Sequence, residues 1–177
     1  MPTSVKSESD KSTFLDIPLL SLDRQSIVSK TTLSHREENR NHFISVEVGP
    51  CCEGQIFEGW SAKIALDNFR QSLEKDSLLI AVEGALIYAS YSRMCHDMGQ
   101  GYSGYNYKNR KLGDMSIPER ISTFKIVSPV EYLFVSSLAD QQEFTDNPDM
   151  WQKIITERKN PSRSLKCILS SIFKSKK

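Results

Sequence analysis

The sequence predicts an α+β fold in which an antiparallel sheet packs against helices within a single domain. Three stretches support this prediction. Residues 43–48 alternate apolar and polar side chains as a half-buried strand does, residues 62–73 repeat apolar side chains at helical spacing, and residues 78–91 form the most apolar run of the chain. The length of 177 residues, the net charge of +1 and the 38% hydrophobic content fit one globular domain with polar ends.

Residues 1–42 are expected to form a flexible N-terminal arm. The arm is mostly polar, and residues 23–42, with His35 and His42 in solvent, are interpreted as a linker. An apolar patch at 14–22 interrupts it and has two open interpretations: it packs on its own domain, or it docks on a neighbouring subunit. The second interpretation assigns self-association to Phe14, Leu15, Ile17, Leu19 and Leu20, with Tyr102 and Tyr105 from a later loop.

A globular domain is expected over residues 43–157. Its first strand covers residues 43–48, and Ser61 is placed to cap the helix that follows. Trp60 is expected in the core. The helix should bury one stripe, made of Ala62, Ala65, Leu66, Phe69 and Leu73, and hold Lys63, Asp67, Arg70 and Glu74 away from it.

The run 78–91 should lie in the core, because almost none of its side chains is polar. It is too short to cross a bilayer, which needs about 20 apolar residues, and Glu83 and Gly84 interrupt it. Its β-branched and aromatic residues favour two short strands hinged at Gly84, although its alanines would also suit a buried helix. We expect the run and the strand at 43–48 to form the sheet on which the helix lies.

Residues 96–116 contain four glycines and three tyrosines without periodicity, which predicts one long exposed loop. Two interpretations of its basic residues stay open: they bind nucleic acid beside the tyrosines, or they are ordinary surface charges. The glycines do not match a phosphate-binding motif. The basic residues of this loop are Lys108, Arg110 and Lys111.

Residues 121–138 are expected to form an antiparallel hairpin, with Pro129 limiting its first strand to an edge or turn. Residues 140–149 are acidic and are interpreted as a turn. A further helix would then begin near Asn147 and continue through Met150 and Trp151.

The four cysteines do not show the spacing of a zinc site, and we expect them to be reduced and structural, with no metal and no cofactor. Cys95 beside His96 is the one nucleophile and base pair in the sequence, and no third member is visible, so no catalytic residue is assigned. The polar N-terminus has no apolar signal-peptide core, which predicts residence in the cytosol.

The C-terminal residues 158–177 are basic, and their apolar side chains recur at helical spacing after Pro161. Such a tail either lies on an anionic membrane or the nucleocapsid, or packs on the domain as a terminal helix. Cys167 would be open to acylation in the membrane case. The first interpretation assigns contact to Arg158, Lys159, Arg163, Lys166, Ile168, Leu169, Ile172, Phe173, Lys174, Lys176 and Lys177.

Residues 117–154 resemble the C-terminal half of rhabdovirus matrix proteins. The resemblance is carried by Ile117-Pro118-Glu119, by the acidic turn and by Met150-Trp151, and it extends upstream to the strand at residue 43. It implies a structural protein of the virion that binds itself, the nucleocapsid or nucleoprotein, a membrane and a viral glycoprotein. Late-domain motifs and a lysine-rich arm are missing, which fits a plant-infecting, cytorhabdovirus-like member better than an animal one.

The expected function is therefore that of a non-enzymatic viral matrix protein. It would self-associate, condense the nucleocapsid and link it to a membrane during assembly and budding, in the virion and peripherally at membranes of the host cytoplasm. Direct contact with nucleic acid stays open. The alternative is a small adaptor, such as an immunity or effector protein, that binds one protein partner and stays monomeric or forms a closed dimer. An enzyme is the third class considered.

Overall fold

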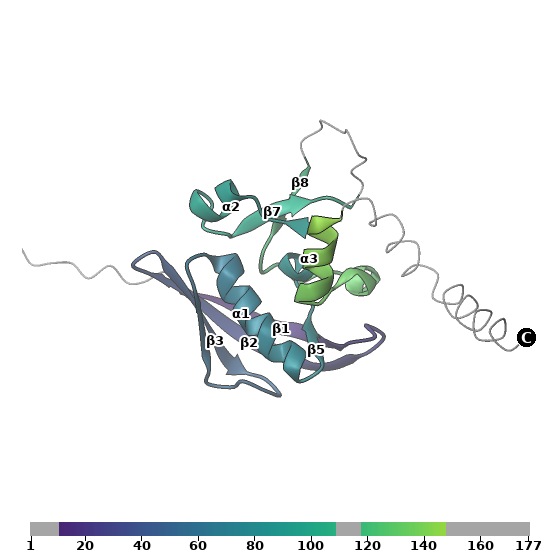
Figure 1. Cartoon of the computed structure of the whole chain (residues 1–177). Coiled ribbons are helices and arrows are strands. Elements are labelled where there is room, and N and C mark those ends of the chain that lie inside the picture. The colour runs from purple at the N-terminus through teal and green to yellow at the C-terminus, as the bar shows by residue number, and fades with distance from the viewer. Residues whose placement is uncertain (1–10, 109–117, 148–177) are drawn as a thin grey trace, which may run out of the picture.

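The computed structural model describes residues 11–108 and 118–147 and has a mixed α and β fold around a five-stranded antiparallel sheet (Figure 1). The strands of this sheet lie in the order β4-β3-β2-β1-β5. They are β1 (Lys11–Ser21), β2 (Ile27–Glu38), β3 (Asn41–Val48), β4 (Ile56–Gly59) and β5 (Leu78–Ile80).

A smaller antiparallel sheet has the order β6-β7-β8 and lies beyond the N-terminal end of helix α1 (Figure 1). Its strands are β6 (Ala89–Ser90), β7 (Ser103–Asn106) and β8 (Glu119–Ser122). The helical elements are α1 (Ala62–Lys75), η1 (Glu83–Ala85), α2 (Arg93–Asp97), η2 (Pro129–Phe134) and α3 (Leu138–Asp146), where η1 and η2 are 3₁₀ helices.

Helix α1 packs across the large sheet, as its apolar spacing predicts. Ser61 is the N-cap residue, and its side chain accepts a hydrogen bond from the backbone N–H of Ile64. This cap satisfies one of the amide groups that have no partner within the first turn. The predicted apolar stripe of the helix is buried, which confirms both the helix and its packing face.

The run 78–91 lies in the core, as expected, and supplies β5 and β6 on either side of η1. Gly84 lies in η1, where a Cβ atom would stand 2.7 Å from the backbone oxygen of Thr123. Only glycine therefore fits at this contact. β5 belongs to the same sheet as β3, the strand at residue 43, which confirms that part of the expectation, whereas β6 belongs to the smaller sheet, so the run joins the two sheets.

The expectation of a flexible arm is wrong for residues 11–42, which form β1, β2 and the start of β3 in the large sheet. β1 is a central strand between β2 and β5, and its apolar residues Ile17, Leu19 and Leu20 are fully buried. Pro18 is tolerated because the register with β2 shifts on both sides of it. Three of the five residues assigned to self-association from this patch are thus core residues.

The expectation that His35 and His42 are solvated is also wrong. Both are buried, and His35 Nε2 lies 3.1 Å from His42 Nδ1. β2 and β3 pair so that His42 faces Glu37, which makes the two histidines diagonal neighbours on one side of the sheet. The rings of Tyr102 and Phe124 pack against this pair.

The segment that was expected to be one long loop contains structure. α2 begins just before it, β7 lies inside it, and residues 109–117 fall outside the described part. The expected hairpin at 121–138 is wrong as well, because β8 pairs with β7 and residues 129–134 form η2. Ser128 and Pro129 at the start of η2 favour this helical turn. The expected acidic turn at 140–149 is mostly α3.

Several expectations fall outside the described residues. These are the helix through Met150 and Trp151, the basic tail at 158–177, and the loop residues Arg110 and Lys111.

Candidate functional site

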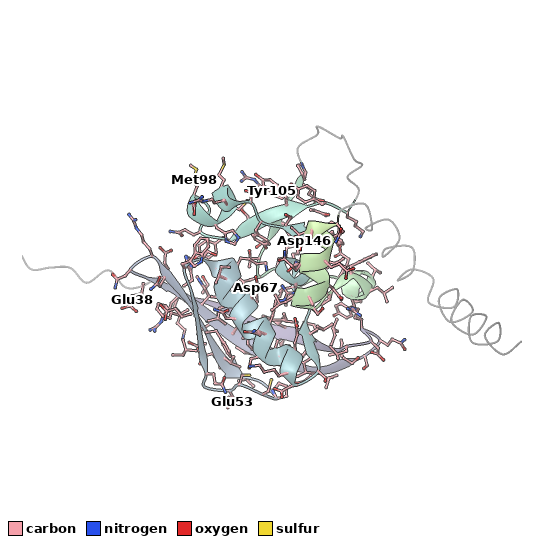
Figure 2. All side chains as sticks on the ribbon, in the orientation of Figure 1. Glu38, Glu53, Asp67, Met98, Tyr105 and Asp146 are labelled. Carbon is pink, nitrogen blue, oxygen red and sulfur yellow. The ribbon has the colours of Figure 1, made fainter. Side chains whose placement is uncertain are left out.

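A group of side chains lies at the surface on and beside α2, and we call it the α2 surface: the exposed Trp60, Arg93, Met94, Asp97 and Met98, and the half-buried His96. Trp60 is 53% exposed and Met98 is 80% exposed. The expectation that Trp60 lies in the core is therefore wrong. Figure 2 labels Met98 at the outer end of α2, away from the large sheet. Trp and Met on a surface are typical of contact sites, because both bury much apolar area on binding.

The α2 surface is held in place by a cap on α2 itself and by contacts of His96 with Ser61 and Trp60. Ser92 caps α2 by accepting a hydrogen bond from the amide of Cys95 at 3.2 Å. His96 Nδ1 lies 2.9 Å from Ser61 Oγ, and the His96 ring lies 5.0 Å from that of Trp60. α2 is therefore a positioned element, although it is only five residues long.

An open hollow of about 510 Å³ lies within this surface, lined by Trp60, Arg93, His96 and Asp97. Arg93 Nε and Asp97 Oδ2 pair across its rim at 3.3 Å. Burial, together with the charge of Lys63, lowers the pKa of His96, so the imidazole is neutral at pH 7. The hollow thus presents the uncharged rings of Trp60 and His96, and the charges of Arg93 and Asp97 neutralise each other. This lining suits an apolar side chain of a protein partner.

A second exposed apolar group lies on and just before η2, and we call it the η2 surface: Ile126, Val130 and Leu133. Val130 is 79% exposed. Because a 3₁₀ helix has three residues per turn, Val130 and Leu133 lie above one another on the same side of η2. In Figure 1, α2 and the helical turn that precedes α3 lie on opposite sides of the molecule.

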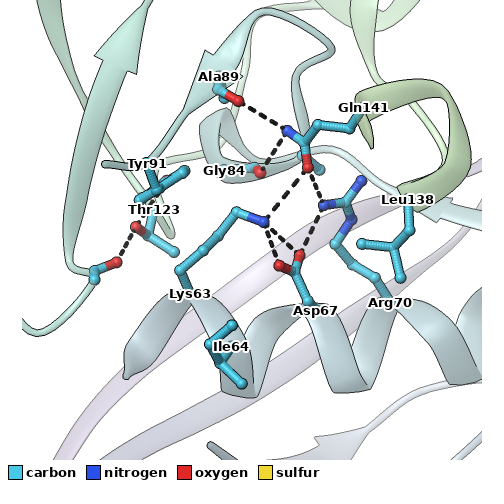
Figure 3. Close-up of polar contacts among 12 residues, drawn as sticks. Lys63, Ile64, Asp67, Arg70, Gly84, Ala89, Tyr91, Thr123, Leu138 and Gln141 are labelled. Carbon is cyan, nitrogen blue, oxygen red and sulfur yellow. Dashed lines mark hydrogen bonds and ion pairs between the residues drawn. The ribbon is translucent and has the colours of Figure 1, made fainter. Parts of the chain in front are cut away.

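A buried polar cluster joins α1 to α3 and to the 78–91 run (Figure 3). Lys63 bonds both carboxylate oxygens of Asp67, and Arg70 Nη1 donates to Asp67 at 2.9 Å and to Gln141 Oε1 at 2.7 Å. Gln141 Nε2 in turn donates to the backbone oxygen of Leu86 at 2.7 Å. Lys63 and Arg70, expected on the solvent side of the helix, are therefore buried under α3.

The cluster has one chemical feature of an active site, since burial and the charge of Arg70 lower the pKa of Lys63 to about 8. Its geometry is that of a structural clamp. The Lys63 side chain is 6% exposed and its ammonium group contacts Asp67 and Gln141, leaving no approach for a substrate. The cluster thus fixes α3 and the η1 turn onto α1.

The structure does not bring Lys108, from the predicted basic loop, together with Tyr102 and Tyr105, assigned to self-association, as one site. Lys108 Nζ lies 4.6 Å from the centre of the Phe134 ring and 3.9 Å from a Glu131 oxygen, so it is engaged within the domain. Tyr102 packs its edge on the histidine pair, whereas Tyr105 lies in β7. Of the self-association residues from the N-terminal patch, Leu15 is well exposed.

The structure joins His96 to Ser61 and not to its neighbour Cys95. The Cys95 sulfur instead accepts from Ser92 Oγ at 3.3 Å. Ser61 is fully buried as the cap of α1, so its contact with His96 is a structural one.

The sequence interpretation missed the α2 surface because it placed Trp60 in the core and residues 96–116 in a loop. One local signal was present. Ser92 precedes a segment in which Met94 and Met98 are four residues apart, the spacing of neighbours on one side of a helix.

Neither the protein-family models nor the curated proteins include a match to this chain. Within residues 11–108 and 118–147, the helices are too short or too polar to span a membrane.

Proposed function

We propose that this chain is a viral matrix-type structural protein that assembles with copies of itself, condenses a nucleocapsid and links it to a membrane. The observation that carries the proposal is the presence of two unlike exposed apolar surfaces, on α2 and on η2, on opposite sides of one small domain (Figure 1). Contiguous exposed apolar groups on a soluble domain are typical of protein contact sites. The sequence resemblance to rhabdovirus matrix proteins supports the same class.

In this proposal the η2 surface of one copy docks on the α2 surface of the next. Val130 projects from η2 beside Pro129, whereas the α2 surface offers an open hollow beside Trp60. A projecting aliphatic side chain and a hollow lined by rings are complementary in shape and polarity. The net charge of +1 means that copies do not strongly repel one another.

A contact between two different surfaces is heterologous, and it leaves one of each surface free at the ends of any chain of copies. Such contacts produce rings or open helical assemblies, whereas a contact between identical surfaces closes as a dimer. An open assembly is what a protein needs to coat a helical nucleocapsid. The basic tail at 158–177, outside the described residues, supplies the membrane or nucleocapsid contact in this proposal.

Sedimentation velocity of the full chain over a range of concentrations tests the proposal. We expect species that grow with concentration beyond a dimer. Met98→Glu and Val130→Glu should each weaken association by about tenfold or more, because Val130→Glu puts a charge on the side chain that enters the hollow, and Met98→Glu puts one on the α2 surface that the next copy covers. Both side chains are highly exposed in the single copy, so its stability should hardly change.

Leu15→Glu is the matched control, since it adds the same charge at an exposed apolar residue of β1, outside both surfaces. It should leave association unchanged. A monomer at every concentration would contradict the proposal and favour the adaptor. Loss of association in Leu15→Glu alone would move the contact to the N-terminal strand.

A further inference from the structure

The loop between β3 and β4 brings two thiols against the C-terminal end of α1. Cys51 and Cys52 are half-buried free cysteines, and Asp76 is the exposed C-cap residue of α1. The two sulfur atoms and a carboxylate oxygen of Asp76 all lie within 4.8 Å of one another. In Figure 2 the label of Glu53 marks this loop.

The backbone of the loop explains how two consecutive side chains reach one place. Side chains of neighbouring residues point to opposite sides in a strand. Cys52 instead has a φ of 60°, in the left-handed region, and its carbonyl accepts from the amide of Gln55 at 2.9 Å. The turn directs the Cys52 sulfur to α1, where it lies 3.1 Å from Ser72 Oγ.

We propose that Cys51, Cys52 and Asp76 bind one thiophilic divalent cation of the Zn²⁺ class. A tetrahedral zinc ion with Zn–S bonds of about 2.3 Å holds two sulfur ligands about 3.8 Å apart. The three ligand atoms lie within 4.8 Å of one another, so each pair needs to move closer together by about 1 Å or less to form the site. A water molecule or the Ser72 hydroxyl completes the four positions.

The donor set decides the class of cation. Two thiols and one carboxylate select zinc-like ions over Mg²⁺ and Ca²⁺, which prefer oxygen ligands throughout. Each thiol loses its proton to solvent as its sulfur bonds to the cation, so no oxidant or reductant is needed. The site does not depend on the proposed function, because its residues lie outside the α2 and η2 surfaces.

The bound cation would connect the β3–β4 loop to the end of α1. These segments are already in contact at this point, through Cys52 with Ser72 and through Cys51 with Asp76. A ligand that binds the folded chain stabilises it by mass action. Zinc should therefore raise the unfolding temperature of the protein.

The test is a titration with Co²⁺ of the full chain carrying Cys95→Ser and Cys167→Ser, kept reduced with a phosphine. We expect thiolate-to-cobalt charge-transfer absorption and the visible bands of tetrahedral Co²⁺, saturating at one equivalent and displaced by Zn²⁺. Cys51→Ser and Cys52→Ser should abolish the charge-transfer band. Asp76→Asn should weaken binding by about tenfold or more, since loss of even an outer-shell partner costs about 10- to 100-fold.

Circular dichroism of each variant without metal controls for folding, and serine keeps the size and polarity of the loop. The proposal is overturned if folded Cys51→Ser or Cys52→Ser protein retains the charge-transfer band. It is also overturned if the parent chain gives no thiolate band, or if Zn²⁺ raises the unfolding temperature of Cys52→Ser as much as that of the parent.

Discussion

Replacing Asp67 by Asn is expected to lower the free energy of unfolding by about 3 kcal/mol at neutral pH. Asp67 is the carboxylate that contacts both Lys63 and Arg70 in the buried cluster (Figure 3). The substitution keeps the size of the side chain but leaves two buried cations without a countercharge. Breaking a buried ion pair costs about 3–5 kcal/mol, and Asp67, whose side chain is 23% exposed, belongs at the low end of that range.

Urea unfolding followed by circular dichroism measures this loss. The control is Asp97→Asn, which removes a carboxylate that pairs with exposed Arg93 on α2 and should change stability by about 0.5 kcal/mol or less. Similar values for the two variants would mean that the cluster does not clamp α3 to α1.

Acidification is expected to destabilise the domain between pH 6.5 and pH 4 through the buried histidine pair. Burial and the neighbouring His42 lower the pKa of His35 to about 4, and burial lowers the pKa of His42 as well, despite the opposing charge of Glu37. The folded chain therefore binds fewer protons than the unfolded chain in this range, and stability falls as the pH falls. His35 alone accounts for up to about 3.5 kcal/mol, from a pKa difference of 2.5 at about 1.4 kcal/mol for each unit.

The free energy of unfolding in urea, measured from pH 7.5 to pH 4, tests this expectation. In a variant with His35→Gln and His42→Gln, the slope between pH 6.5 and pH 4 should largely disappear, because glutamine forms hydrogen bonds but does not titrate. Parallel pH profiles of the variant and the natural chain would contradict the assignment. Glu47 contributes at a lower pH, because hydrogen bonds from Ser34 and Lys11 lower its pKa.

The elements that the sequence predicted well are those with a local signal. α1 has a helical apolar stripe and a serine cap within 15 residues, and β3 has a clear alternation. β1 and β2 lack such a signal because their burial depends on strands that are distant in sequence. β2 buries Thr31 and Ser34, whose hydroxyl groups bond Val48 and Glu47 of the next strand. A polar segment of this kind is indistinguishable from a linker until its partner strand is known.

The buried polar cluster and the α2 surface were missed for a related reason. The period of α1 placed Lys63 and Arg70 on the solvent side, but α3 covers that side, and its Gln141 supplies their partner. Trp60 is a large aromatic residue of the kind found in cores, yet it lies where β4 ends, half exposed, with the His96 ring packed on it. Burial at these positions follows from how the second sheet and α3 dock on α1, which no local pattern encodes.

The central claim is that copies of this chain associate through two different surfaces, and mixing two single-surface variants tests it most directly. Met98→Glu leaves only the η2 surface intact, and Val130→Glu leaves only the α2 surface intact. At a concentration at which the unsubstituted chain associates, each variant alone should be monomeric, because its association is weakened about tenfold or more, and an equimolar mixture should sediment as a one-to-one complex that does not grow further. A mixture that remains monomeric, or a variant that dimerises alone, would contradict association between unlike surfaces.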